Sequence, residues 1–230
     1  METTEEDWRL MRERVRKNYE EHRVAEDLVE QFTVHNRQVE DFVAKFSEAE
    51  NFNDKEKEIA ILCSILHDAT KGYGDFLEHG KEGGEFAKAL LGDMGFSEDL
   101  AESVRLGIER HMGREGYVAA RAKEKYGNDF EYSSPRTKVG QLVYVCDILT
   151  QITEEGFNKI LTIRKADPDC IRADMAVAEE KGISAAAAAR LSALESAKKS
   201  YEIIMEGRDY PMESVRAFAQ ELWIDLQEKI

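Results

Sequence analysis

An apolar run that ends in a histidine and an aspartate constrains the fold of this chain more than any other stretch. Residues 59–66 are almost all apolar, and His67 and Asp68 follow directly. The charged residues before the run are good helix formers, and Asp54 is suited to cap a helix. A helix that is apolar on most sides lies inside a domain. We therefore predict a buried helix over residues 54–68.

The carboxylate at the end of this predicted helix needs a cationic partner. An ionised carboxylate costs much free energy inside a protein unless a cation meets it. The adjacent His67 makes a metal ion a candidate partner for Asp68. For one His-Asp pair alone, a hydrogen-bonded core histidine beside a helix-ending aspartate is an equal alternative, because a metal site must be argued from a whole set of residues.

The rest of the sequence also shows helical spacing, which predicts an all-α fold. Apolar residues recur three and four positions apart along most of the chain, first over residues 8–19. Glycines and prolines separate the apolar stretches, and no stretch alternates as a strand would. We expect Gly95 to end one helix, Ser97 and Ser184 to cap others, and Pro211 to begin the last.

Three further histidines lie where these helices face the core or end. His35 lies on the apolar stripe of a helix, and His111 lies at the inner end of another. His79 stands before a pair of glycines, Gly83 and Gly84, that we expect to precede a helix. Each of these histidines taken alone has an ordinary structural explanation, such as a hydrogen-bonded core residue. The fifth histidine, His22, lies in a charged stretch and is expected at the surface.

Asp147 is a second acidic residue inside an apolar predicted helix, and it needs a cation as Asp68 does. A buried arginine or a neighbouring helix end is the alternative partner. Imidazoles and carboxylates are ligands that zinc, iron and manganese accept. Six such groups can hold two ions if one carboxylate bridges them. The six candidate ligands are His35, His67, Asp68, His79, His111 and Asp147.

The net charge indicates which partners the chain can bind, and the cysteines indicate its cellular compartment. The formal net charge of -15 repels nucleic-acid backbones and favours divalent cations, so we expect no nucleic-acid binding. Cys63, Cys146 and Cys170 are isolated, which fits a reducing compartment. The acidic start has no apolar core of a signal peptide, and no apolar stretch is long enough to cross a bilayer. We therefore expect a cytoplasmic protein without a membrane partner.

The order of these residues resembles the HD superfamily of metal-dependent phosphohydrolases, which is named for its His-Asp pair. The resemblance covers roughly residues 25–160 and does not extend to the tails. Helical spacing predicts an N-terminal helix over 1–24 and a C-terminal helical extension over 161–230, and we expect both to pack on this core. The family often has Ile-Gly where this chain has Ala69 and Thr70, which loosens any assignment to a branch. The matching stretches are Val-His-Asn-Arg-Gln-Val at 34–39, Leu-His-Asp-Ala-Thr-Lys at 66–71, His-Gly at 79–80, Glu-Arg-His at 109–111 and Val-Cys-Asp at 145–147.

The resemblance implies a centre of two divalent metal ions, with iron or manganese favoured over zinc, nickel, cobalt or magnesium. A hydroxide shared by the two ions would be the nucleophile. The first ion would be bound by His35, His67, Asp68 and Asp147, and Asp68 would bridge to a second ion held by His79 and His111.

Basic residues near the site are candidates for substrate binding. The resemblance implies that Lys71 contacts the substrate phosphate, with a solvent-exposed lysine at a helix end as the alternative. Arg114, Arg136 and Lys138 are further candidates on charge and position only, with ordinary surface charges as the alternative. The polar stretch 113–135 follows His111 directly, and we expect it to act as a lid.

Three function classes stay open at this point. The first is hydrolysis of a phosphoester in a nucleotide or another small phosphorylated molecule. The second is a di-iron oxygenase, because a minority of proteins with this fold use the same ligands for oxygen chemistry. The third is a metal-stabilised regulatory or binding module. The retention of all six ligand residues argues against this third class. A homodimer is compatible with each.

Overall fold

The computed structural model describes residues 3–73, 77–111, 137–207 and 212–229. All regular secondary structure in these ranges is helical, which confirms the predicted all-α fold. The chain divides into two compact units, Met1–Asp147 and Ile148–Ile230. No helix of the described ranges combines the length and the apolar character that a membrane crossing requires.

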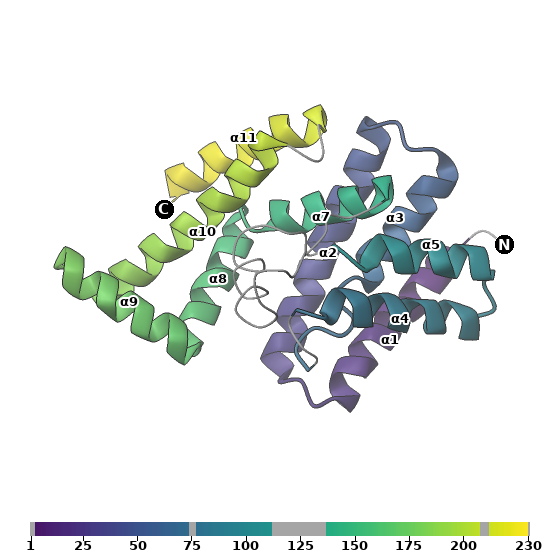
Figure 1. Cartoon of the computed structure of the whole chain (residues 1–230), viewed down its shortest axis with the longest axis horizontal. Helices are drawn as coiled ribbons and strands as arrows, with labels where there is room; N and C mark the ends of the chain where they lie inside the picture. The colour runs from purple at the N-terminus through teal and green to yellow at the C-terminus, as the bar shows by residue number, and fades with distance from the viewer. Residues whose placement is uncertain (1–2, 74–76, 112–136, 208–211, 230) are drawn as a thin grey trace, which may run out of the picture. The chain divides into compact units, whose positions relative to one another are not determined.

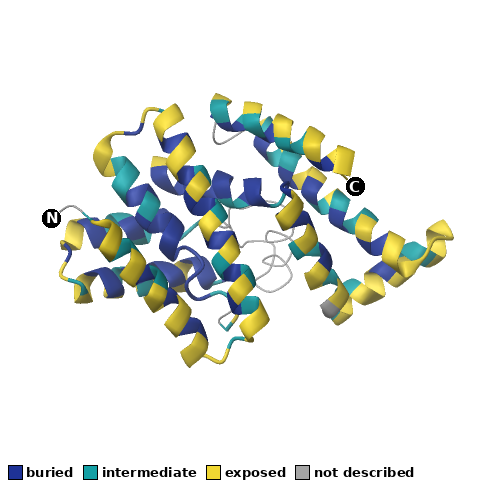
Figure 2. Cartoon of the chain, turned by 180° about the vertical axis from the view of Figure 1, so that it is seen from behind, coloured by how far each residue is buried: buried dark blue, intermediate teal, exposed yellow. Residues whose placement is uncertain are grey.

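The first unit is built around its third helix. This helix, α3, packs against all four of the helices α1, α2, α4 and α5 (Figure 1). Its middle and end are buried, as predicted from the apolar run. Figure 2 shows that most helices carry a buried side and an exposed side, as amphipathic spacing predicts. The helices are α1 (Glu5–Glu21), α2 (Glu26–Ala49), α3 (Asp54–Leu66), α4 (His79–Asp93), α5 (Glu98–Ile108) and the first part of α7 (Lys138–Thr150).

Both ends of α3 differ from the prediction. The N-cap is Asn53 rather than Asp54, because Asn53 Oδ1 accepts from the Glu56 backbone N–H at 3.0 Å while the Glu56 carboxylate accepts from the Asn53 N–H at 2.9 Å. The helix ends at Leu66, so the His-Asp pair lies in the turn after it. In that turn the backbone bonds span three residues, as from the Lys71 N–H to the Asp68 carbonyl at 2.8 Å.

The start of α4 is also earlier than predicted. The helix begins at His79 itself, and the glycines expected before it lie inside its first turns. A Cβ atom on Gly80 would lie 2.9 Å from the Glu109 carbonyl oxygen, and one on Gly83 would lie 2.9 Å from the His67 carbonyl oxygen. These glycines therefore allow a close approach between helix and turn, and they do not mark a loop.

The other predicted helix ends of the first unit are confirmed. Gly95 has the left-handed φ of +83° directly after α4 and ends that helix. Ser97 caps α5, because its hydroxyl accepts from the Leu100 backbone N–H at 3.3 Å. His22 is exposed as expected, and its ring stacks on Tyr73 with centroids 3.8 Å apart.

The second unit is a set of helices packed around α10. This helix contacts α8, α9 and α11. Its small buried side chains, such as Ala189 and Ala193, allow close packing. Ser184 caps it as predicted, Gly207 ends it, and Pro211 lies outside the described residues. The helices are the last part of α7, α8 (Glu154–Ala166), α9 (Pro168–Lys181), α10 (Ala185–Glu206) and α11 (Glu213–Lys229).

A buried ion pair joins three of these helices. The Arg164 guanidinium on α8 contacts both carboxylate oxygens of Asp174 on α9, at 2.5 and 3.2 Å, and the Ser192 hydroxyl on α10 donates to the same carboxylate at 2.8 Å. Burial alone would raise the pKa of Asp174, but the hydrogen bonds from Arg164 and Ser192 outweigh it and hold that pKa below its ordinary value.

Candidate metal centre

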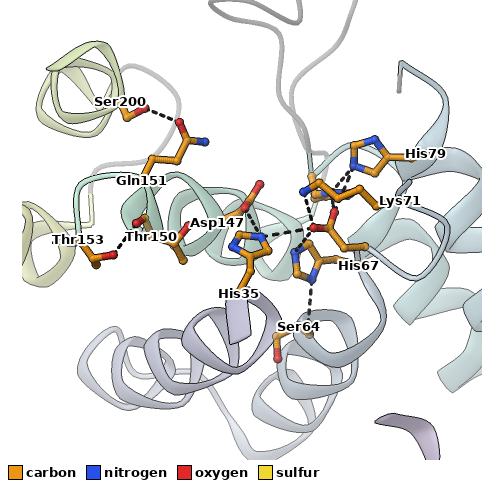
Figure 3. Close-up of polar contacts among 12 residues, drawn as sticks. His35, Ser64, His67, Lys71, His79, Asp147, Thr150, Gln151, Thr153 and Ser200 are labelled. Atoms are coloured by element: carbon orange, nitrogen blue, oxygen red, sulfur yellow. Dashed lines mark hydrogen bonds and ion pairs between the residues drawn. The ribbon is translucent and has the colours of Figure 1, made fainter. Parts of the chain in front are cut away.

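The structure brings all six predicted ligand residues together inside the first unit. Five different elements supply them, namely α2, the turn after α3, the first residue of α4, the turn after α5, and α7. Figure 3 shows the side chains of His35, His67, His79, Lys71 and Asp147 converging on one place. The Asp68 carboxylate lies at the middle of this cluster and is fully buried.

Each oxygen of Asp68 faces a different pair of histidines. Oδ2 lies 3.4 Å from Nε2 of His35 and 3.6 Å from Nε2 of His67. Oδ1 lies 3.3 Å from Nε2 of His79 and 3.5 Å from Nε2 of His111. The cluster therefore consists of two ligand groups of metal-binding size that share one carboxylate. All members of both groups are buried.

Asp147 extends the first of these two groups. Its Oδ1 lies 3.0 Å from Nε2 of His35. Burial alone would raise the pKa of Asp147, but the hydrogen bond and charge of His35 outweigh it and hold that pKa far below its ordinary value. This carboxylate is therefore ionised at neutral pH and offers oxygen ligands beside those of Asp68.

Local backbone contacts orient two of the imidazoles. Nδ1 of His67 lies 2.8 Å from the Ser64 carbonyl oxygen, and Nδ1 of His111 lies 2.9 Å from the Ile108 carbonyl oxygen. A carbonyl can only accept, so each of these two Nδ1 atoms carries a proton. Metal-binding histidines are commonly held in this way, because the second nitrogen donates to a carbonyl or carboxylate.

The protonation states in the cluster suit a divalent cation. Burial lowers the pKa of His67 to about 3, so its imidazole is neutral. Burial alone would raise the pKa of Asp68, but Lys71 and the surrounding histidines outweigh it and hold the pKa well below its ordinary value. Nε2 of His67 is buried and has no hydrogen-bond partner among the described residues. Neutral imidazoles and ionised carboxylates are the deprotonated forms that bind metals, so this donor set fits divalent ions.

Lys71 lies in the site and not in solvent. Its ammonium group forms an ion pair with Oδ2 of Asp68, and its side chain is 21% exposed. Burial would lower the pKa of Lys71, but the charges of Asp68 and Asp147 outweigh it and raise that pKa. The structure thus disfavours the alternative of a solvated lysine at a helix end.

The other basic candidates do not join the cluster in the described part of the chain. Arg114, Arg136 and the expected lid over 113–135 lie outside the described residues. Lys138 lies at the start of α7, where its ammonium is 4.0 Å from the centre of the Phe52 ring. It is half exposed, so the structure favours the surface interpretation for this residue.

Thr70 supports the site, although no role was expected for it from the sequence. Its hydroxyl donates to the His79 carbonyl oxygen at 3.0 Å, and Thr70 is buried. The bond joins the turn that carries Asp68 to the first turn of α4, and so it links the two ligand groups. The departure from the common Ile-Gly pattern at this position was the signal that could have pointed to it.

Comparison with known families agrees with this geometry. A family model described as HD domain matches residues 33–152, a range that contains all six candidate ligands and Lys71. No curated protein and no solved structure shows significant similarity to the chain.

Proposed function

Because this chain belongs to the HD domain family, we propose that it is a metal-dependent phosphohydrolase that cleaves a phosphoester in a nucleotide or another small phosphorylated molecule. The observation that carries the proposal is the sharing of Asp68. One carboxylate faces two pairs of buried histidines, one pair at each oxygen. This arrangement suits two neighbouring cations with a common ligand.

The proposed ligands divide between two ions as the geometry of Asp68 suggests. Two divalent ions held here would supply a water of lowered pKa and positive charge to stabilise a phosphoryl group. The mixture of imidazole nitrogens and carboxylate oxygens favours iron or manganese, with zinc, nickel, cobalt and magnesium as further candidates. The first set is His35, His67, Asp68 and Asp147, and the second is Asp68, His79 and His111.

Lys71 is the residue that we propose for binding the substrate phosphate. Its ammonium group lies in the cluster. The pKa of Lys71 is raised, so the group remains charged at neutral pH. A lysine offers three donors on a flexible stem, which allows it to exchange a carboxylate partner for a phosphate oxygen. Its side chain is partly exposed, whereas the Asp68 carboxylate that it pairs with is fully buried.

The buried setting of the ligands strengthens their interactions with charge. His67, Asp68 and His111 are completely buried, and His35 and His79 nearly so. Electrostatic interactions are stronger where water is excluded, and groups that are already oriented need little rearrangement during a reaction. The chain's own contribution is therefore to hold ionised carboxylates and neutral imidazoles in fixed positions around the reacting phosphate.

Metal loading and turnover test this proposal directly. The full-length protein is stripped with a chelator, reloaded with Mn²⁺ or Fe²⁺, and assayed against nucleotides and small phosphoesters. We expect two ions per chain and hydrolysis that requires them. Oxygen uptake by the iron-loaded protein without phosphoester hydrolysis would favour an oxygenase instead. A chain that binds no divalent ion would contradict the enzyme proposal and favour a regulatory module.

A further inference from the structure

We propose that helix α1 supports the metal centre by holding the turn that carries Asp68. On this helix, Tyr19 and Asn18 are positioning residues for Asp68. This inference rests on the proposed function, because it treats Asp68 as a metal ligand. The helix lies outside residues 33–152, the range that the HD domain model matches. Its contribution is therefore a feature of this chain in addition to the matched core.

The Tyr19 hydroxyl reaches the backbone of the shared ligand. It donates to the Asp68 carbonyl oxygen at 2.7 Å in a buried setting. The Tyr19 ring is 1% exposed and packs against Phe32 with ring centroids 5.5 Å apart, so the hydroxyl is held in place. The carbonyl of a residue turns with its ψ angle, and this bond therefore fixes the backbone rotation directly beside the Asp68 side chain.

Asn18 holds the next carbonyl of the same turn. Its Nδ2 donates to the Ala69 carbonyl oxygen at 2.9 Å and to the Tyr73 hydroxyl at 2.5 Å. Two consecutive residues of α1 thus bind two consecutive carbonyls of the turn after α3. The Asp68 carbonyl also accepts from the Lys71 backbone N–H at 2.8 Å, so Tyr19 adds a second donor to it, and Asn18 gives the Ala69 carbonyl a partner just past the end of the helix.

A third contact constrains the carbonyl that precedes these two. The His67 carbonyl lies against Gly83 of α4, where an added Cβ would be 2.9 Å from the oxygen. The carbonyls of residues 67, 68 and 69 are therefore each constrained, by α4, Tyr19 and Asn18 in turn. The direction in which the Asp68 carboxylate points follows from these constraints, and so does its division between the two histidine pairs.

The docking of α1 does not depend on these two hydrogen bonds. Arg12 makes an ion pair with both carboxylate oxygens of Glu40 on α2, and Glu40 is buried. Met11 and Val15 pack in the core on the same face of the helix as Tyr19. Removing the Tyr19 hydroxyl should therefore leave α1 in place and free only the turn that carries Asp68.

The test compares Tyr19→Phe with a matched control in the same helix. Val15→Ala removes buried apolar atoms one turn earlier, at a position 4% exposed, and has no polar group facing the turn. We measure Mn²⁺ affinity by calorimetric titration and unfolding by urea without metal, in the full-length wild type, both variants and Asn18→Ala. Residues that support metal ligands typically change metal affinity by about 10- to 100-fold when mutated. We expect a loss of this size for Tyr19→Phe and a smaller change, within about 2-fold, for Val15→Ala.

The outcomes separate this inference from the proposed function. A wild type that binds no Mn²⁺, Fe²⁺ or Zn²⁺ overturns the proposed function, and the role of α1 falls with it. A wild type that binds Mn²⁺ and a Tyr19→Phe variant that binds it equally well overturn only the role of Tyr19. Equal losses of affinity in Tyr19→Phe and Val15→Ala would mean that α1 acts through general stability, which also overturns the inference. Loss of affinity in Tyr19→Phe and Asn18→Ala, without loss in Val15→Ala, supports it.

Discussion

The sharing of Asp68 predicts that its removal and the removal of His79 have different effects on metal content. Asp68 contributes one oxygen to each ligand group, so Asp68→Ala should lose both ions and all phosphoester turnover. His79 faces only the second group. Under the proposed function, His79→Ala should therefore keep the first ion and still lose most activity, because the attacking water would need both ions for its lowered pKa.

The size of the stability difference follows from the number of ions retained. At a free metal concentration 100-fold above the dissociation constant, each ion adds about 2.7 kcal/mol to the free energy of unfolding. For a chain of this length, 1 kcal/mol shifts Tm by about 2–4 °C, so each ion should be worth about 5–10 °C. In excess metal we expect wild type to gain about twice the shift of His79→Ala, and Asp68→Ala to gain none.

The assay measures metal per chain, turnover and Tm with and without metal for wild type, both variants and His22→Ala. His22 is an exposed histidine outside both ligand groups and serves as the matched control, with two ions expected. Two tightly bound ions and normal turnover in His79→Ala would refute its assignment as a ligand. One retained ion in Asp68→Ala would refute the idea of a shared carboxylate.

Three further predictions concern the scaffold. The pKa of Asp174 is lowered in the folded chain, so its pairing with Arg164 stabilises the fold above the unfolded pKa of about 3.9, and this stabilisation is lost as the pH falls through the folded pKa. The free energies of unfolding of wild type and Asp174→Asn, measured in urea, should therefore converge as the pH is lowered below the folded pKa of Asp174. Gly80→Ala should lower the free energy of unfolding by about 1–3 kcal/mol, because the added methyl group overpacks its surroundings. Gly92 has open space around it, so Gly92→Ala should raise the free energy of unfolding by about 0.5–1 kcal/mol through better helix propensity. Asn53→Ala removes a capping box and should cost about 1 kcal/mol in urea unfolding, and an unchanged midpoint would refute the cap.

The clustering of the candidate ligands could be predicted from the sequence because their signals are local. His35 falls on an apolar helical stripe, and Asp68 and Asp147 are charges in apolar runs. A buried charge needs a partner wherever the chain places it, so these residues indicate a cation site before any contact is known. The helix periodicity that locates them also predicts the all-α fold.

The supports of the ligands could not be predicted in the same way. Tyr19 is part of an apolar stripe in the sequence, and its hydrogen bond joins it to a carbonyl 49 positions away. The glycines of α4 suggested a loop, because a glycine's role in close packing depends on a neighbour that the sequence does not place. The choice of Asn53 over Asp54 as cap is a shift of one residue, and helix ends are commonly uncertain to that degree.

The close contacts of Gly80 and Gly83 also limit how far the backbone around the candidate metal centre can shift. One glycine rests on the turn that carries His111, and the other rests on the carbonyl of His67. A side chain at either position would force the helix or the turn to shift, whereas the ligand distances in a metal site vary by only about 0.2 Å. Positions that carry no functional group should therefore be as intolerant of substitution as the ligands. A variant at either glycine should lose its metal chemistry before it loses its fold.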